Sequence, residues 1–291
     1  MRAVLVATAV AALILGATAC GSGSGPTYPV NVYVAGKHFA SVAPGHPSSF
    51  LPKALIVQQA HGEIFLHVDQ AVANTLVDQA LANHQGRVDL PYTRVRSFIK
   101  MELQHQLFHH DSEVTALSMI ASSVGIDAPQ VRLVPLLRRN GPAAPQPIPG
   151  SKLFRWGDPE KGFVGKPNAP GPRGGFGVYE APIRRLGAKS GVHLVGFDGK
   201  SVAAVRTALF EGHPLIAWVD WDGAAGGHTT WVTPSGKKIT VSVGERAIVL
   251  TGAGPGYYLL NDPGSGKEYK WSLSRFSTRW QMLGRRALEL P

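Results

Sequence analysis

The chain has 291 residues, of which 44% are hydrophobic, so it is long and apolar enough to bury a core and does not have the composition of a disordered protein. Lysine and arginine (29) outnumber aspartate and glutamate (19), and the formal net charge of +10 favours anionic partners. The basic residues form no recognisable nucleic-acid-binding module. We therefore expect an anionic membrane surface or an acidic ligand as partner, and no nucleic acid.

The first residues of the chain have the features of an export signal. Arg2 supplies a positive charge, and residues 3–16 form an apolar segment that is too short to span a membrane on its own. Small residues then precede Cys20, the only cysteine in the chain. This arrangement resembles a bacterial lipoprotein signal, with residues 1–19 as the signal peptide. An ordinary secretory signal with an incidental cysteine is the alternative.

The resemblance implies that Cys20 receives a lipid anchor and becomes the mature N-terminus. Residues 20–27 are rich in glycine and serine, which predicts a flexible tether behind the anchor. A basic protein on such an anchor lies close to anionic lipid headgroups. We therefore expect an extracytoplasmic protein that is lipid-anchored, through diacylglycerol and palmitate, to the bacterial cell membrane.

Residues 28–98 are predicted to form a small α+β subdomain. An alternating apolar and polar segment turns at Gly36–Lys37, which is typical of a β-hairpin. A strand over 62–69 then leads into a helix over 70–84, with Asp69 as its N-cap. The rest is mostly extended, and nothing in the subdomain indicates chemistry, so we expect a structural or adhesive role. The predicted apolar face of the helix consists of Val72, Leu76, Val77 and Leu81.

Residues 99–291 begin with a helix and continue mainly as antiparallel strands, which predicts an α+β domain. The helical periods cover 112–123 and 201–213, and a short helix over 274–284 follows the last strand. Strand patterns joined by turn signals occupy most of 214–273. Two segments rich in proline and glycine are predicted to be loops, namely 139–150 and 165–177.

Several segments of this second part resemble one known family in the family's own order. "DSEVTALSMIASSVGI" is similar to the segment around the catalytic cysteine of the bacteriocin-processing (double-glycine leader) peptidase-like family, part of the papain-like cysteine peptidase superfamily. "WGDPEKGFVG", "HTTWVTPSGKKITVSVGERAIVL" and "YYLLNDPGSG" follow. The resemblance covers about residues 99–288. It implies a papain-like domain, in which an N-terminal helix packs on an antiparallel sheet.

The resemblance also assigns catalytic positions, and two of them carry unexpected residues. Ser112 stands where the family has its nucleophilic cysteine, and Arg246 stands where it has the histidine base. Asp262 keeps the place of the orienting acid, while Gln104, or Gln106 as a second candidate, corresponds to the oxyanion-hole glutamine. Arginine stays protonated and has no lone pair with which to accept a proton from serine.

These substitutions predict an ion pair in place of a catalytic pair. The Arg246 guanidinium is suited to bind the Asp262 carboxylate, because an arginine presents several N–H donors to a carboxylate. We therefore expect a pseudopeptidase that binds a peptide or cell-wall ligand and needs no cofactor. Two alternatives stay open: a hydrolase that uses Ser112 with a non-standard base such as His228, and a purely structural envelope protein.

Other interpretations concern the residues around the predicted site. Ser112 and Asp111 are both good N-cap residues for the helix that follows. The group of His105, His109 and His110 beside Asp111 has some metal-ligand character, but the segment has the sequence of a loop and no cysteine is near, so we expect no metal. Aromatic side chains in segments that border the predicted cleft are Trp156, Trp218, Trp221 and Trp231.

Overall fold

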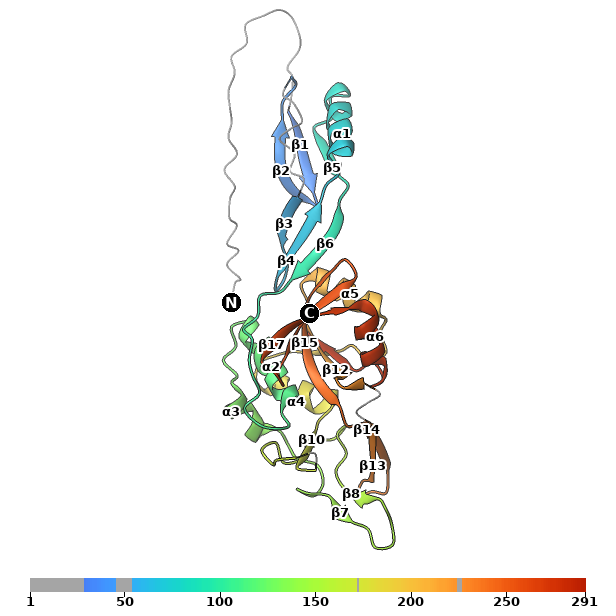
Figure 1. Ribbon diagram of the computed structural model, residues 1–291. Coiled ribbons are helices and arrows are strands. Elements are labelled where there is room, and N and C mark those ends of the chain that lie inside the picture. The colour runs from blue at the N-terminus through green and yellow to red at the C-terminus, as the bar shows by residue number, and fades with distance from the viewer. Residues whose placement is uncertain (1–28, 46–53, 172, 224–226) are drawn as a thin grey trace, which may run out of the picture. The chain divides into compact units, whose positions relative to one another are not determined.

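The computed structural model describes residues 29–45, 54–171, 173–223 and 227–291. The predicted signal peptide, Cys20 and the tether lie outside the described residues. The chain divides into two compact units (Figure 1). The smaller unit contains residues up to Leu55 and Leu66–Thr93, and the larger contains Ile56–Phe65 and Arg94–Pro291.

The smaller unit is built on a three-stranded sheet. Strands β1 (Val30–Val34) and β2 (Lys37–Val42) form the predicted hairpin, and β5 (Arg87–Leu90) pairs with β1 in parallel. The turn residues Ala35 and Gly36 both have positive φ angles, +51° and +75°. Positive φ at both turn positions matches the right-handed twist of the two strands, so the hairpin closes in two residues.

Helix α1 (Gln70–Ala82) begins where the sequence predicts it. Asp69 is the N-cap, and its carboxylate accepts hydrogen bonds from the amides of Ala71 and Val72. The predicted apolar face is wrong in one respect, because Val72 is 44% exposed. The side chains that α1 buries are instead Ala73, Val77 and Ala80, which lie a little further round the helix.

The boundary between the two units falls within three strands. These strands are β3 (Ala54–Gln58), β4 (Glu63–His67) and β6 (Thr93–Phe98). The strands predicted over 62–69 and in the extended segment that follows α1 are therefore present.

The core of the larger unit forms between helix α2 (Ser112–Ser123) and an antiparallel sheet. In this sheet β15 (Glu245–Gly254) pairs with β12 (Leu215–Asp220) on one side and with β16 (Tyr257–Asp262) on the other. Every residue of α2 from Ser112 to Ala121 is buried. The sheet continues through β17 (Lys267–Ser272) at one end and through β18 (Ala287–Glu289) and β11 (Val195–Gly196) at the other.

Further helices cover the sheet on both faces (Figure 1). Helices α2 and α4 (Glu180–Lys189) lie on one face, while α5 (Val202–Glu211) and α6 (Leu273–Gln281) lie on the other. Helix α4 is an element that the sequence analysis did not predict. Four of its ten residues are charged, and Ile183 and Leu186 are its only large apolar side chains. The apolar period that indicates a helix is therefore weak in this segment.

The segments rich in proline and glycine are loops with very short strands inside them. The 139–150 segment contains β7 (Gln146–Pro147), which pairs with β8 (Phe154–Arg155). The 165–177 segment contains β10 (Gly175–Gly177), which pairs with β9 (Val164–Gly165). Strands β13 (His228–Val232) and β14 (Lys238–Ser242) join β7 and β8 in a separate sheet. Two short helices complete the unit, α3 (Gln130–Leu133) and the 3₁₀ helix η2 (Val134–Leu136).

The fold class is thus α+β, as the sequence predicts. Within the described ranges, no helix is both long enough and apolar enough to cross a membrane.

Candidate functional site

Ser112 is the first residue of α2 and faces β15. Its Oγ accepts a hydrogen bond of 3.2 Å from the amide of Ala247, and the side chain is almost fully buried, with 9% exposed. The family nucleophile position and the strand that carries the base position are therefore adjacent. The expectation that Ser112 caps its helix is wrong, because its hydroxyl is turned toward β15. Asp111 is the residue at the N-cap, but its carboxylate makes no capping hydrogen bond with α2.

Arg246, the residue before Ala247 on β15, makes the ion pair that the sequence predicts. Its Nη1 lies 2.9 Å from Oδ2 of Asp262, a side chain with no exposed surface. The guanidinium carbon lies 4.7 Å from the centre of the Trp221 ring. On another side it lies so close to Gly264 that a β-carbon there would collide with it. The arginine is therefore held in a fixed orientation toward Asp262.

The Asp262 carboxylate has several further partners at the turn after β16. It accepts hydrogen bonds from the amide of Gly264 and from both the amide and the hydroxyl of Ser265. These donors orient the carboxylate toward position 246, which is the arrangement that an orienting acid requires. The residue that the Asp262 carboxylate contacts at position 246 is a cation that cannot accept a proton.

Neither glutamine donates a hydrogen bond to Ser112. Gln104 accepts a hydrogen bond from Nε2 of Gln130 at 3.2 Å. Gln106 donates through its side-chain amide to the carbonyls of Phe108 and His109. Both side chains are half-buried and engaged in holding the segment that leads into α2.

The contacts of the candidate histidines in the described residues are with groups other than the Ser112 hydroxyl. His228 is exposed on β13, where its backbone pairs with Ser242. His105 contacts the carbonyl of Gly264 at 3.1 Å, and His110 contacts the carbonyl of Gly171 at 3.1 Å. Among the described residues, no histidine makes a hydrogen bond with Ser112, and no group of three or more potential metal ligands is assembled.

A set of buried acids around Ser112 was not predicted from the sequence. Glu113 is 1% exposed, and its Oε1 accepts a hydrogen bond of 2.7 Å from the amide of Val178. Gly177 lies against this carboxyl and has a φ angle of +117°, so any side chain at position 177 would displace the acid. The other carboxyl oxygen of Glu113 lies 3.4 Å from Ser112 Oγ. The glutamate therefore fills the space beside the serine.

The environment of these acids raises their pKa values. Burial raises the pKa of Glu113 to about 8, and the charge of Asp111 adds to this effect. Burial also raises the pKa of Asp111 to about 7. The pKa of Glu245 is raised well above its ordinary value, first by burial and then by the charge of Glu113. With this raised pKa the Glu113 carboxyl is mainly protonated at neutral pH, which limits its capacity to accept a proton from Ser112.

A related cluster lies at the start of α4. Arg286 contacts Glu180 at 2.7 Å and Glu160 at 2.6 Å, and its guanidinium lies over the ring of Tyr179. Burial raises the pKa of Glu180 to about 7, although the charge of Arg286 acts in the opposite direction. Arg286 therefore supplies a counter-charge to the buried Glu180 and to the partly exposed Glu160.

The tryptophans divide into core and site residues. Trp156, Trp218 and Trp231 are fully buried, and the last two donate hydrogen bonds to backbone carbonyls in the core. Trp221 is only partly buried and contacts Arg246. Of the four tryptophans named from the sequence, it is the one that contacts a candidate site residue.

Comparison with known proteins agrees with this geometry. Residues 98–288 match the model of the Peptidase_C39-like family. The chain therefore belongs to the C39-like peptidase family, as the sequence resemblance predicts. In structure it is similar to a proposed C39-like peptidase from Bacillus anthracis, with a TM-score of 0.55 and 23% sequence identity over 65% of this chain and 93% of that chain. At this identity the likeness concerns the fold. No curated protein matches the chain.

Proposed function

We propose that the protein is a lipid-anchored envelope protein whose C39-like domain binds a peptide or cell-wall ligand without cleaving it. The observation that carries this proposal is the Arg246–Asp262 ion pair, with its N–O distance of 2.9 Å, at the position of the family's base and acid. Attack by a serine requires a group that removes its proton. Among the described residues, the hydrogen-bond partners of Ser112 Oγ are an amide N–H and a carboxyl whose pKa is raised to about 8.

The surroundings of Arg246 have features that suit an anionic group of a ligand. The Arg246 side chain is 30% exposed, and its contact with Asp262 uses one of its five N–H donors. Trp221 provides an aromatic surface beside it. A ligand carboxylate, such as the C-terminus of a peptide, would therefore find a fixed cation next to an aromatic ring.

Labelling with a fluorophosphonate probe tests the absence of catalysis. We expect no labelling of the native protein above the level of the Ser112→Ala variant, because no group near Ser112 activates its hydroxyl. The matched control is Ser122→Ala, which removes a partly exposed serine from the same helix. Labelling that is lost in Ser112→Ala and kept in Ser122→Ala would overturn the proposal in favour of a serine hydrolase.

Two arginine variants separate ligand binding from a purely structural role. In an anisotropy screen with fluorescent peptides and cell-wall fragments, a bound ligand should lose affinity in Arg246→Ala. The control is Arg275→Ala, because Arg275 also stacks on a tryptophan but does so on α6. If no fragment binds the native protein, a structural envelope role replaces the proposed one.

The lipid anchor has a test of its own. Substitution of Cys20, the only cysteine, by serine should release the protein from the membrane fraction of a bacterial host into the soluble fraction. Mass spectrometry of the native protein should show an acylated N-terminal cysteine, which the Cys20→Ser variant lacks. An unmodified Cys20 in a protein that is exported normally contradicts the anchor and indicates an ordinary secretory signal.

A further inference from the structure

A cavity of about 510 Å³ opens at the outer face of α4, formed with the segment that follows η2 and with Lys161. It contains none of the family site positions and is thus independent of the proposed cleft. Five cationic side chains line it, and no acidic side chain of the described residues does. The five are Arg138, Arg139, Lys161, Arg185 and Lys189.

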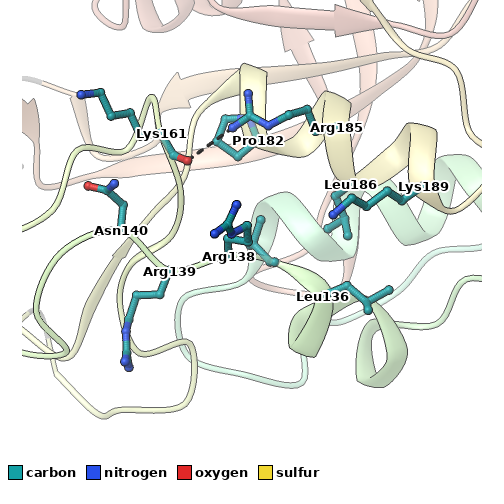
Figure 2. A pocket seen from close by; sticks show the side chains of 10 residues that line it. Leu136, Arg138, Arg139, Asn140, Lys161, Pro182, Arg185, Leu186 and Lys189 are labelled. Atoms are coloured by element: carbon teal, nitrogen blue, oxygen red, sulfur yellow. Dashed lines mark hydrogen bonds between the residues drawn. The ribbon is translucent and has the colours of Figure 1, made fainter.

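The cations of this cavity, which we call the basic pocket, have no counter-charge in the described part of the chain. Seven ion pairs are present there, and none includes a residue of the basic pocket. Figure 2 shows the side chains of Arg138, Arg185 and Lys189 toward the middle of the pocket, while Arg139 and Lys161 extend outward at its rim. Like charges that line one cavity repel one another, and an anion bound between them offsets this repulsion.

Hydrogen bonds hold two of the three inner cationic residues, Arg185 through its side chain and Arg138 through its backbone. Arg185 and Lys189 are four residues apart on α4, so they project from the same face of the helix. Arg185 donates one hydrogen bond, of 3.3 Å, to the carbonyl of Lys161, which anchors its guanidinium and leaves other N–H donors for a ligand. Arg138 is anchored through its backbone, because its carbonyl accepts the amide of Phe163 at 2.9 Å.

Apart from Asn140, the remaining lining is apolar. Leu186, which is 2% exposed, and the buried Pro182 come from α4, while Leu136 and Leu137 come from the end of η2 and the residue after it. The cavity volume is within the range of small-molecule sites and is far larger than a single phosphate ion needs. The pocket therefore has room for an anionic group together with the organic group that carries it.

We propose that the basic pocket binds a phosphate ester, with the phosphate held by Arg138, Arg185 and Lys189. A phosphate group carries up to two negative charges and several acceptor oxygens, which matches the planar guanidinium groups of Arg138 and Arg185 together with the ammonium group of Lys189. A single carboxylate would leave most of this positive charge uncompensated. The apolar lining contacts the organic part of the ester. The phosphate belongs either to a soluble ester or to the headgroup of an anionic lipid.

Titration calorimetry on the full chain tests the proposal with two probes. The soluble probe is glycerol 3-phosphate, and the lipid probe is a phosphatidylglycerol vesicle compared with a phosphatidylcholine vesicle, all at one ionic strength. We expect saturable binding of at least one probe, and a loss of about tenfold or more in affinity in Arg138→Gln/Arg185→Gln, because hydrogen bonds to charged groups are strong. Binding of the soluble probe assigns a soluble ester, and binding of the vesicle alone assigns a lipid headgroup.

The matched control separates a site from general surface charge. Lys238→Gln/Lys267→Gln removes the same net charge from exposed positions on β14 and β17, outside the pocket. The control should bind the probe as the native protein does. Equal loss in both double variants would overturn the proposal, and so would absence of saturable binding of either probe. Since the substituted side chains are exposed, thermal unfolding of each variant should match that of the native protein.

Discussion

Restoring the family residues at both altered positions, by Ser112→Cys together with Arg246→His, should produce a reactive thiol. Ser112 Oγ already lies 3.2 Å from the amide of Ala247, so the side chain at position 246 begins one residue from the nucleophile. The Asp262 carboxylate now accepts a hydrogen bond from Arg246. It would accept a hydrogen bond from an imidazole at position 246 in the same way. An imidazolium beside a thiol stabilises the thiolate.

The expected increase follows from the thiolate fraction. A free cysteine has a pKa of about 8.5, and a histidine-paired cysteine has a pKa between about 3.5 and 7.5. After allowance for the lower nucleophilicity of a more acidic thiol, the alkylation rate at pH 6 should rise about tenfold over that of Ser112→Cys alone. Iodoacetamide kinetics between pH 5 and 9 measures this difference. All variants carry Cys20→Ser, so that the introduced thiol is the only one.

A matched control tests whether the position of the histidine matters. Ser112→Cys with Arg275→His makes the same exchange at another arginine that stacks on a tryptophan. It should react as Ser112→Cys alone does. If the two double variants have the same alkylation rate across the pH range, position 246 does not face position 112, and the assignment of the family positions is wrong.

The second large effect concerns stability, which we expect to fall as the pH rises from about 5 to 8. The pKa of Glu113 is about 8 in the folded protein, while in the unfolded chain its carboxyl loses the proton near pH 4 to 5. Between these values the folded state binds more protons than the unfolded state, so the free energy of unfolding decreases with pH. Asp111 and Glu180, with pKa values raised to about 7, act in the same direction. His110 acts in the opposite direction, because burial lowers its pKa.

Replacing Glu113 by glutamine should remove a large part of this pH dependence. The amide of glutamine keeps an oxygen acceptor for the Val178 N–H and never ionises, so the variant should lose less stability between pH 5 and 8, by on the order of 2 kcal/mol. Urea unfolding followed by tryptophan fluorescence measures this. All six tryptophans lie in the larger unit, so the signal reports on that unit alone.

An exposed glutamate provides the control for this measurement. Glu268→Gln, on β17, makes the same chemical change at the surface and should leave the pH dependence of the native protein unchanged. If Glu113→Gln and the native protein show parallel stability profiles, Glu113 is already ionised in the folded state at neutral pH. Its carboxylate would then be available as a base beside Ser112, and the proposed loss of catalysis would need revision.

Much of the candidate site could be predicted from the sequence because its chemistry is local. The family order of segments identified Ser112, Arg246 and Asp262, and the fixed charge of arginine excluded it as a base before any geometry was known. The hairpin turn at Gly36 and the cap at Asp69 were also predictable, since each depends on a few neighbouring residues.

Other features depend on which faces of an element are covered, and local patterns do not contain that information. Glu113 follows a serine at a helix start, a place where an acid is normally solvated, but the surrounding structure buries every residue of α2 from Ser112 to Ala121. This burial, and not the residue type, gives Glu113 its raised pKa. In the same way, packing decided that α1 buries Ala73 while Val72 stays exposed.

The sequence by itself thus determined the α+β class and the family, and it predicts the departure of Ser112 and Arg246 from the family pattern, because these depend on residue identity and order. Only the tertiary structure decided the partners of Ser112, the raised pKa of Glu113 and the basic pocket. The inner cations of that pocket come from two separate segments of the chain, Arg138 after η2 and the pair Arg185 and Lys189 on α4. Their mutual repulsion arises only when α4 and the segment after η2 are folded against each other.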